Sequence, residues 1–117
     1  MPEPGSARHR LCRAEEIAEG TARGFDFDGE GKDTLFLVRV GGILRGWRNA
    51  CPHIDGAPMA WRKDAYLNAA GTLIVCHAHG AEFSPETGLC LRGPCQGLSL
   101  ERMRLELAGD GTVFFTP

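Results

Sequence analysis

The stretches CPHIDGAPM, residues 51–59, and CHAHG, residues 76–80, decide how this sequence is interpreted. Each places one cysteine and one histidine on a single short segment: Cys51 with His53, and Cys76 with His79. Thiolates and imidazoles are side chains that bind transition metals in proteins. The segment 51–95 also holds three of the four histidines and four of the five cysteines, so we expect a metal centre there.

The order of these four side chains distinguishes between kinds of metal centre. A cluster of two irons and two sulfides can be held by two cysteines on one iron and two histidines on the other. Two loops that lie side by side, each with one cysteine and one histidine, would supply these four ligands. A zinc finger instead groups its cysteines in one pair and its histidines in the next. The sequence favours the iron–sulfur cluster, with a structural zinc site and a chance grouping of core residues as the alternatives.

The segment before the ligand stretches predicts a frayed start and short strands. Residues 1–8 are polar and proline-rich, and we expect them to be frayed. Arg10–Arg13 is predicted as an edge strand, and Ala14–Gly20 as a loop with a helical turn. Phe25 and Phe27 alternate with aspartates, a period of two that is typical of a half-buried strand.

Two hairpins are predicted on either side of the ligand stretches. Thr34–Val40 and Ile43–Arg48 are separated by two glycines, which suit a tight hairpin turn. Apolar and charged residues alternate over 102–107, and Asp110-Gly111 then turns the chain into Val113-Phe114-Phe115. With 16 glycines and 7 prolines between short apolar runs, the chain is predicted to be all-β.

Length and charge exclude several classes of protein. The chain has 117 residues, 43% hydrophobic and 24% charged, which predicts one globular domain over residues 1–117. Its net charge of −2 argues against a nucleic-acid partner. No membrane span and no signal peptide is recognised, so we expect a cytoplasmic protein. Five cysteines in that compartment argue against disulfides, including one between Cys90 and Cys95, and Cys12 is predicted to be a buried strand residue.

Further motifs make the chain similar to the Rieske [2Fe-2S] family over roughly residues 45–117, and more loosely before that. The motifs that carry the resemblance are Cys51-Pro52-His53, Gly56-Ala57-Pro58-Met59, Cys76-x-x-His79-Gly80, Phe83, Thr87-Gly88 and Gly93-Pro94-Cys95. The resemblance implies a Rieske-like antiparallel β-sandwich with an inserted rubredoxin-like subdomain, whose cluster-binding loops span about residues 48–95.

The same resemblance implies the ligand set. Cys51 and Cys76 would hold the buried iron and His53 and His79 the outer one, with one [2Fe-2S] cluster per chain. Gly93-Pro94 would begin the proline loop that covers the cluster.

The chain departs from the family pattern at several positions. Between Ile54 and Val75 the loop is longer than usual, and we interpret Trp61–Asn68 as an insertion at the rim of the site. Gly56 and Ala78 replace the two cysteines that bridge the loops of high-potential members. Ala81 and Phe83 replace hydroxyl donors to the sulfurs. Without those donors the reduction potential is expected near the low end of the Rieske range, roughly −150 mV.

Other residues near the loops have simpler interpretations. Trp47 is predicted to be a core residue, Met59 to cover the apolar side of the cluster, and His77 to face solvent or make a hydrogen bond without ligating iron. Asp55 and Glu82 are expected to be solvated charges, and Trp61 either caps the insertion or contacts a partner.

The resemblance implies a Rieske-type ferredoxin, a one-electron carrier between a flavin reductase and a terminal oxygenase, and a monomer. It would not be an enzyme by itself, because an oxygenase also needs a mononuclear iron held by two histidines and a carboxylate. Only His9 and His77 would remain for such a site. A small subunit of a larger reductase, such as nitrite reductase, and a zinc-stabilised interaction module are the alternatives.

Overall fold

The computed structural model describes residues 9–26, 29, 31, 33–50, 64–76, 80–93 and 96–116. The regular elements in these ranges are short strands and one turn of 3-10 helix. In chain order they are β1 (His9–Arg13), η2 (Ala14–Glu16), β2 (Thr21–Phe25), β3 (Leu35–Val40), β4 (Ile43–Arg48), β5 (Ile74–Cys76), β6 (Ala81–Phe83), β7 (Cys90–Arg92), β8 (Arg102–Leu107) and β9 (Thr112–Thr116). The predicted all-β class is confirmed. Within the same ranges, no helix has the length and apolarity to cross a membrane.

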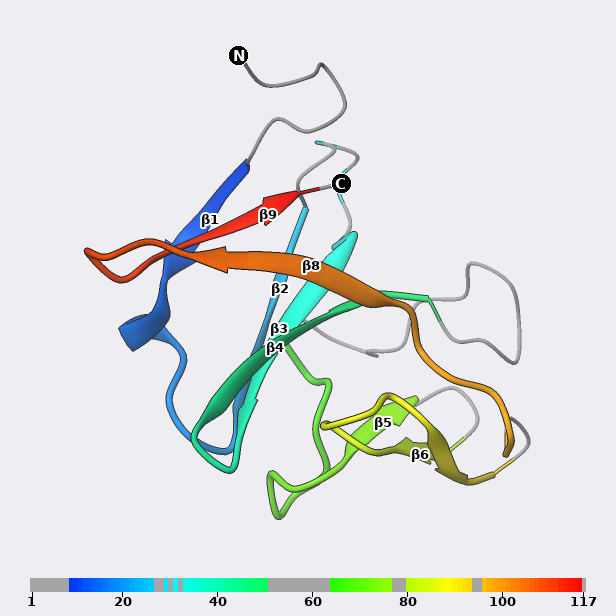
Figure 1. Ribbon diagram of the computed structural model, residues 1–117. Coiled ribbons are helices and arrows are strands. Elements are labelled where there is room, and N and C mark those ends of the chain that lie inside the picture. The colour runs from blue at the N-terminus through cyan, green and yellow to red at the C-terminus, as the bar shows by residue number, and fades with distance from the viewer. Residues whose placement is uncertain are drawn as a thin grey trace.

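Six strands form one antiparallel sheet in the order β1-β9-β8-β4-β3-β2 (Figure 1). At its centre, β3 and β4 pair from Leu35 opposite Arg48 up to the turn, as predicted. Gly41 and Gly42 form the turn at positive φ, 67° and 78°, which glycine adopts without steric cost. The carboxylate of Glu19 fixes this turn by accepting both glycine N–H groups at 2.7 Å.

The outer strands of this sheet come from both ends of the chain. β1 is an edge strand that pairs with β9, and β8 and β9 form the second predicted hairpin. The helical turn expected after β1 is η2. Residues 1–8 lie outside the described part of the chain.

The strand predicted around Phe25 and Phe27 is misplaced. β2 ends at Phe25, and the residues before it pair one by one with β3, with Phe25 opposite Leu35. The position of β2 is therefore set by its pairing with β3 and not by the alternation of phenylalanine and aspartate. Phe27 itself lies outside the described residues.

The remaining three strands form a small antiparallel sheet, β5-β6-β7, which lies below the large sheet in Figure 1. The segment before β5 lengthens it. Leu67 forms a bridge with Ile74, and the N–H of Val75 donates to the carbonyl of Tyr66 at 2.9 Å. The small sheet is thus extended by the segment at Tyr66 and Leu67, which follows the first ligand stretch along the chain.

The buried side chains form two clusters. One lies on the large sheet, with residues of β1, β3 and β9, and includes Cys12, which is 2% exposed, as predicted for a buried strand residue. Burial raises the pKa of its thiol. The other joins the small sheet to β3 and β4, and includes Trp47, Cys76 and Phe83. Trp47 is 1% exposed, which confirms it as a core residue.

Candidate metal centre

Cys76 is the predicted ligand that the structure describes, and it lies at the end of β5. It is fully buried among apolar side chains of the core that joins the two sheets. Its carbonyl accepts a hydrogen bond from the N–H of Gly80 at 2.8 Å. Gly80 has a φ of +70°, so the backbone reverses there and enters β6 with Ala81 opposite Cys76. The thiol therefore stands at the point where the second ligand stretch leaves the small sheet.

The start of the expected proline loop lies against this same strand pair. A Cβ atom on Gly93 would lie 2.8 Å from the Cα of Ala81, and Gly93 has a φ of +100°. Only glycine can make so close an approach between two backbones. Gly93 therefore packs directly on the residue that pairs with Cys76, as a loop that covers the ligand stretch would require.

Most of the other predicted site residues lie outside the described ranges. These residues are Cys51, His53, Asp55, Gly56, Met59, Trp61, His77, Ala78, His79, Pro94 and Cys95. The described ranges hold no group of three or more His, Cys, Asp or Glu side chains that could bind a metal, so Cys76 stands there without the rest of the expected set. The set of four ligands stays a prediction.

The surroundings of Cys76 fit a thiolate that holds a buried iron. A [2Fe-2S] cluster needs soft sulfur ligands, and Cys76 supplies a sulfur that is buried in an apolar core and out of contact with bulk water. Ala81 and Phe83, which follow the ligand stretch on β6, are both fully buried and carry no hydroxyl. These two side chains offer no hydrogen bond to a sulfur, in agreement with a low reduction potential.

The insertion predicted at the rim of the site is instead partly in the core. We expected Trp61–Asn68 to be an insertion at the rim of the site, but Tyr66 is only 1% exposed and its ring stacks on that of Phe36 at 4.0 Å. Its hydroxyl donates to Asp33 at 3.0 Å. The sequence did not reveal these contacts, because Phe36 and Asp33 lie about thirty residues earlier in the chain.

Tyr66 gives a measurable dependence on pH. Burial, and then the negative charge of Asp33, raise the pKa of its phenol above the ordinary value of 10.0. Because the folded pKa is raised, the stabilising contribution of Tyr66 is complete below about pH 10 and is lost at higher pH, where only the unfolded chain ionises. Tyr66 is the one tyrosine of the chain. We expect tyrosinate absorbance to appear together with unfolding in an alkaline titration; absorbance that appears near pH 10.0 in folded protein would contradict this.

The other described cysteine of this region has no ligand role in our interpretation. Cys90 is a free thiol on β7, 2% exposed, and its sulfur lies 3.2 Å from the carbonyl oxygen of Arg92. Cys95 lies outside the described residues, so the absence of a disulfide between Cys90 and Cys95 stays a prediction. Glu82, which we expected to be a solvated charge, lies 3.5 Å from the guanidinium of Arg92 in an ion pair.

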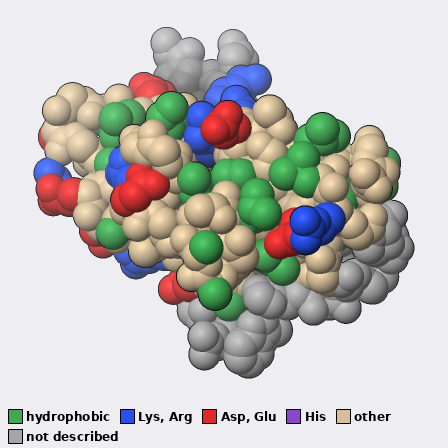
Figure 2. Space-filling view, turned by 90° about the horizontal axis from the view of Figure 1, so that it is seen from below, with side chains coloured by type: hydrophobic (Ala, Val, Ile, Leu, Met, Phe, Trp, Pro, Cys, Tyr) green, Lys and Arg blue, Asp and Glu red, His purple; other side chains and the backbone are tan. Residues whose placement is uncertain are grey.

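Apolar side chains are exposed next to the small sheet. Leu89, Leu91 and Leu98 are 42%, 46% and 47% exposed, and all three lie within a few residues of Gly93. Figure 2 shows hydrophobic side chains spread between isolated charged ones over the face seen from below.

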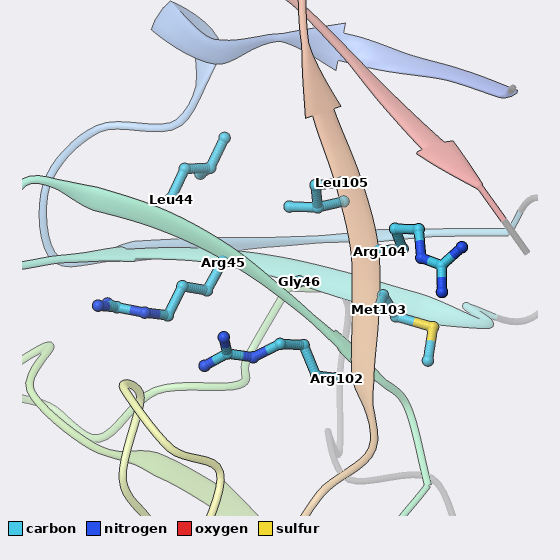
Figure 3. Close-up of a pocket in the computed structure, with 7 residues that line it drawn as sticks. All are labelled: Leu44, Arg45, Gly46, Arg102, Met103, Arg104 and Leu105. Atoms are coloured by element: carbon cyan, nitrogen blue, oxygen red, sulfur yellow. The ribbon is translucent and has the colours of Figure 1, made fainter.

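A separate groove of about 410 Å³ lies on the large sheet, where β8 crosses β4 (Figure 3). β4 and β8 pair at only two positions, Gly46 with Met103 and Trp47 with Arg102, and then diverge. Arg45 and Arg102 extend to one side of β8, whereas Arg104 extends to the other (Figure 3). The three guanidinium groups do not converge, and no lining residue comes from the small sheet that carries Cys76.

Several solved structures share this fold. The ferredoxin of carbazole 1,9a-dioxygenase from Nocardioides aromaticivorans IC177 is 24% identical, with a TM-score of 0.71, and the match covers 96% of this chain and 99% of that one. A Sphingomonas yanoikuyae B1 ferredoxin is 24% identical, with a TM-score of 0.70 over 95% of this chain and 99% of that one. The terminal oxygenase of carbazole 1,9a-dioxygenase from Novosphingobium sp. KA1 is 18% identical, with a TM-score of 0.73 over 94% of this chain but 29% of that one.

Sequence comparison identifies the family. No curated protein matches the chain in sequence. The sequence profile of the Rieske [2Fe-2S] domain does match, over residues 7–103, which is most of the chain and includes both ligand stretches. The protein therefore belongs to the Rieske [2Fe-2S] family.

Proposed function

We propose that this protein is a Rieske-type ferredoxin, a monomer that carries one electron at a time from a flavin reductase to a terminal oxygenase. One domain would hold one [2Fe-2S] cluster per chain, with Cys51 and Cys76 on the inner iron and His53 and His79 on the outer iron. The observation that carries the proposal is the end-to-end match to two ferredoxins, each covered to 99% of its length.

Further support comes from the kind of complex in which a similar chain is found. A chain 25% identical to this one, with a TM-score of 0.70 over 93% of this chain and 92% of that one, belongs to a complex of reduced oxygenase and oxidized ferredoxin in carbazole 1,9a-dioxygenase. The exposed leucines beside Gly93 would suit such a partner, because they lie next to the strand pair that carries Cys76.

The chain's own residues would define how the cluster works. The cluster, when bound, accepts and releases a single electron. Burial of Cys76 keeps water from the sulfur of the inner iron. The apolar side chains of Ala81 and Phe83 give no hydrogen bond to stabilise added negative charge, so the potential would stay low. These roles fit a carrier, which needs to hold a cluster without binding a substrate.

Electron paramagnetic resonance on anaerobically purified protein tests the proposal. We expect a silent oxidised sample and, after dithionite, a rhombic signal whose average g value lies well below that of a cluster with four cysteines. A potential titration should then give a one-electron midpoint of roughly −150 mV. Metal analysis on the same sample serves as the control for incomplete loading.

Two outcomes would contradict the proposal. One zinc per chain in fresh, colourless protein, with no signal after reduction, would assign the loops to a structural metal. A signal typical of four-cysteine ligation would show that the histidines are not ligands, and it would refute the proposed Rieske-type carrier.

A further inference from the structure

The first ligand loop, residues 50–63, begins and ends at residues that bind to the same short segment between β2 and β3. At its start, the N–H of Asn49 donates to the carbonyl of Thr34, and the side-chain amide of Asn49 donates to the carbonyl of Asp33, both at 2.9 Å. Asn49 follows β4 directly and is half-buried. These two bonds fix the point at which the chain leaves the large sheet toward Cys51.

The end of the loop returns to the same place. The hydroxyl of Tyr66 donates to a carboxylate oxygen of Asp33 at 3.0 Å, while its ring lies flat on Phe36. Asp64 accepts the N–H of Gly24 at 2.8 Å. Asp64 is also the non-glycine residue with a positive φ, 65°, in the described ranges. Such a conformation persists where surrounding contacts hold it, and the bond to Gly24 is one of them.

The absence of a side chain at Gly24 makes room for the Asp33 carboxylate. A Cβ atom on Gly24 would lie 2.0 Å from the Asp33 oxygen and 2.9 Å from the Tyr66 hydroxyl. Gly24, the buried residue of β2, thus leaves the room that this carboxylate and phenol occupy. Three separate elements, β2, the segment before β3 and the end of the loop, meet at this hydrogen bond.

We propose that Asp33 is a positioning residue for the metal centre, tying both ends of the first ligand loop to one point. Its carbonyl holds the start of the loop and its carboxylate holds the end. The inference rests on the proposed ligand set, in which this loop carries Cys51 and His53. Fixing both ends limits the conformations open to the loop, so that its two ligands stay in place while the electron is gained and lost.

The test uses variants that remove the carboxylate contact from either side. Asp33→Ala and Tyr66→Phe each delete the bond, whereas Asp33→Asn keeps an oxygen that can accept it. Hydrogen exchange of the peptide that spans the loop reports loop opening in the protein as purified, and iron release to a chelator reports ligand retention. We expect each deletion to speed hydrogen exchange and iron release about tenfold, because it removes one hydrogen bond to a charged acceptor. The rates of Asp33→Asn should stay near those of the unaltered protein.

A double variant and a matched control separate positioning from general stability. Because both deletions remove the same bond, Asp33→Ala with Tyr66→Phe should be no faster than either alone. Glu19→Ala removes a comparable carboxylate contact, to the turn between β3 and β4, far from the loop in sequence. It should lower the free energy of unfolding without speeding loop exchange.

The outcomes distinguish this inference from the proposed function. Loop exchange at the unaltered rate in both deletions, additive effects in the double variant, or equal acceleration by Glu19→Ala would each overturn the positioning role. Because exchange is measured with or without a cluster, a protein that holds no [2Fe-2S] cluster would refute the proposed function while the exchange data still decide whether Asp33 restrains the loop.

Discussion

Replacement of Cys76 by serine is expected to leave the protein with less than about a tenth of the iron bound by the unaltered chain, and to remove its visible colour. Cys76 is fully buried at the end of β5, where its sulfur would be an inner-iron ligand. A serine oxygen is harder than a thiolate and shorter in reach, so it matches neither the chemistry nor the geometry that the iron requires. Iron analysis and visible absorption of freshly purified protein check the prediction.

Cys90→Ser is the matched control for this experiment. Cys90 is also a buried cysteine, it belongs to the same core, and it lies on β7, two strands from β5. Its sulfur lies within hydrogen-bond distance of the carbonyl of Arg92, and a serine hydroxyl could donate to that oxygen. We expect this variant to keep its cluster. Equal iron loss in both variants, or a coloured Cys76→Ser protein, would show that Cys76 is not a specific ligand.

Gly88→Ala is expected to lower the free energy of unfolding by about 3 kcal/mol, and the melting temperature by about 10 °C. A methyl group here would lie 2.5 Å from a ring carbon of Trp47, which is 1% exposed in the core between the sheets. Gly88 also has a φ of +77°, which strains any other residue. Thermal and urea unfolding followed by circular dichroism measure the loss.

Gly42→Ala separates the two causes of that loss. Gly42 has nearly the same φ, +78°, but a methyl group there would meet nothing within 4 Å. Only the backbone strain, about 1 kcal/mol, should remain. A smaller residue in place of Trp47 should partly rescue Gly88→Ala, since the collision would be relieved. If the two alanine variants lose the same stability, the contact between Gly88 and Trp47 does not restrict residue 88.

The parts of the fold predicted correctly are those that depend on neighbouring residues. Two short runs separated by a two-glycine turn identified the hairpin of β3 and β4, because these features lie within about fifteen residues of one another. Alternation over 102–107 and the turn at Asp110-Gly111 identified the hairpin of β8 and β9. By contrast, β2 was placed too late, since its position is decided by pairing with β3 and not by its own pattern. Three-residue strands such as β5 leave too short a pattern to be recognised.

The same distinction between local patterns and long-range contacts applies to the candidate site. The sequence by itself determined the family, because the alternation of cysteine and histidine and the motifs around it are local, and the match to the Rieske [2Fe-2S] domain confirms it. Only the tertiary structure decided where Tyr66, which follows the first ligand stretch, is placed. Tyr66 lies in a segment expected to be an insertion at the rim of the site, and its burial depends on Phe36 and Asp33, which no local pattern connects to it. The type of ligand depends on the identity of single residues, and these can be identified in the sequence. The burial of a residue such as Tyr66 depends on contacts with residues that are distant in the sequence.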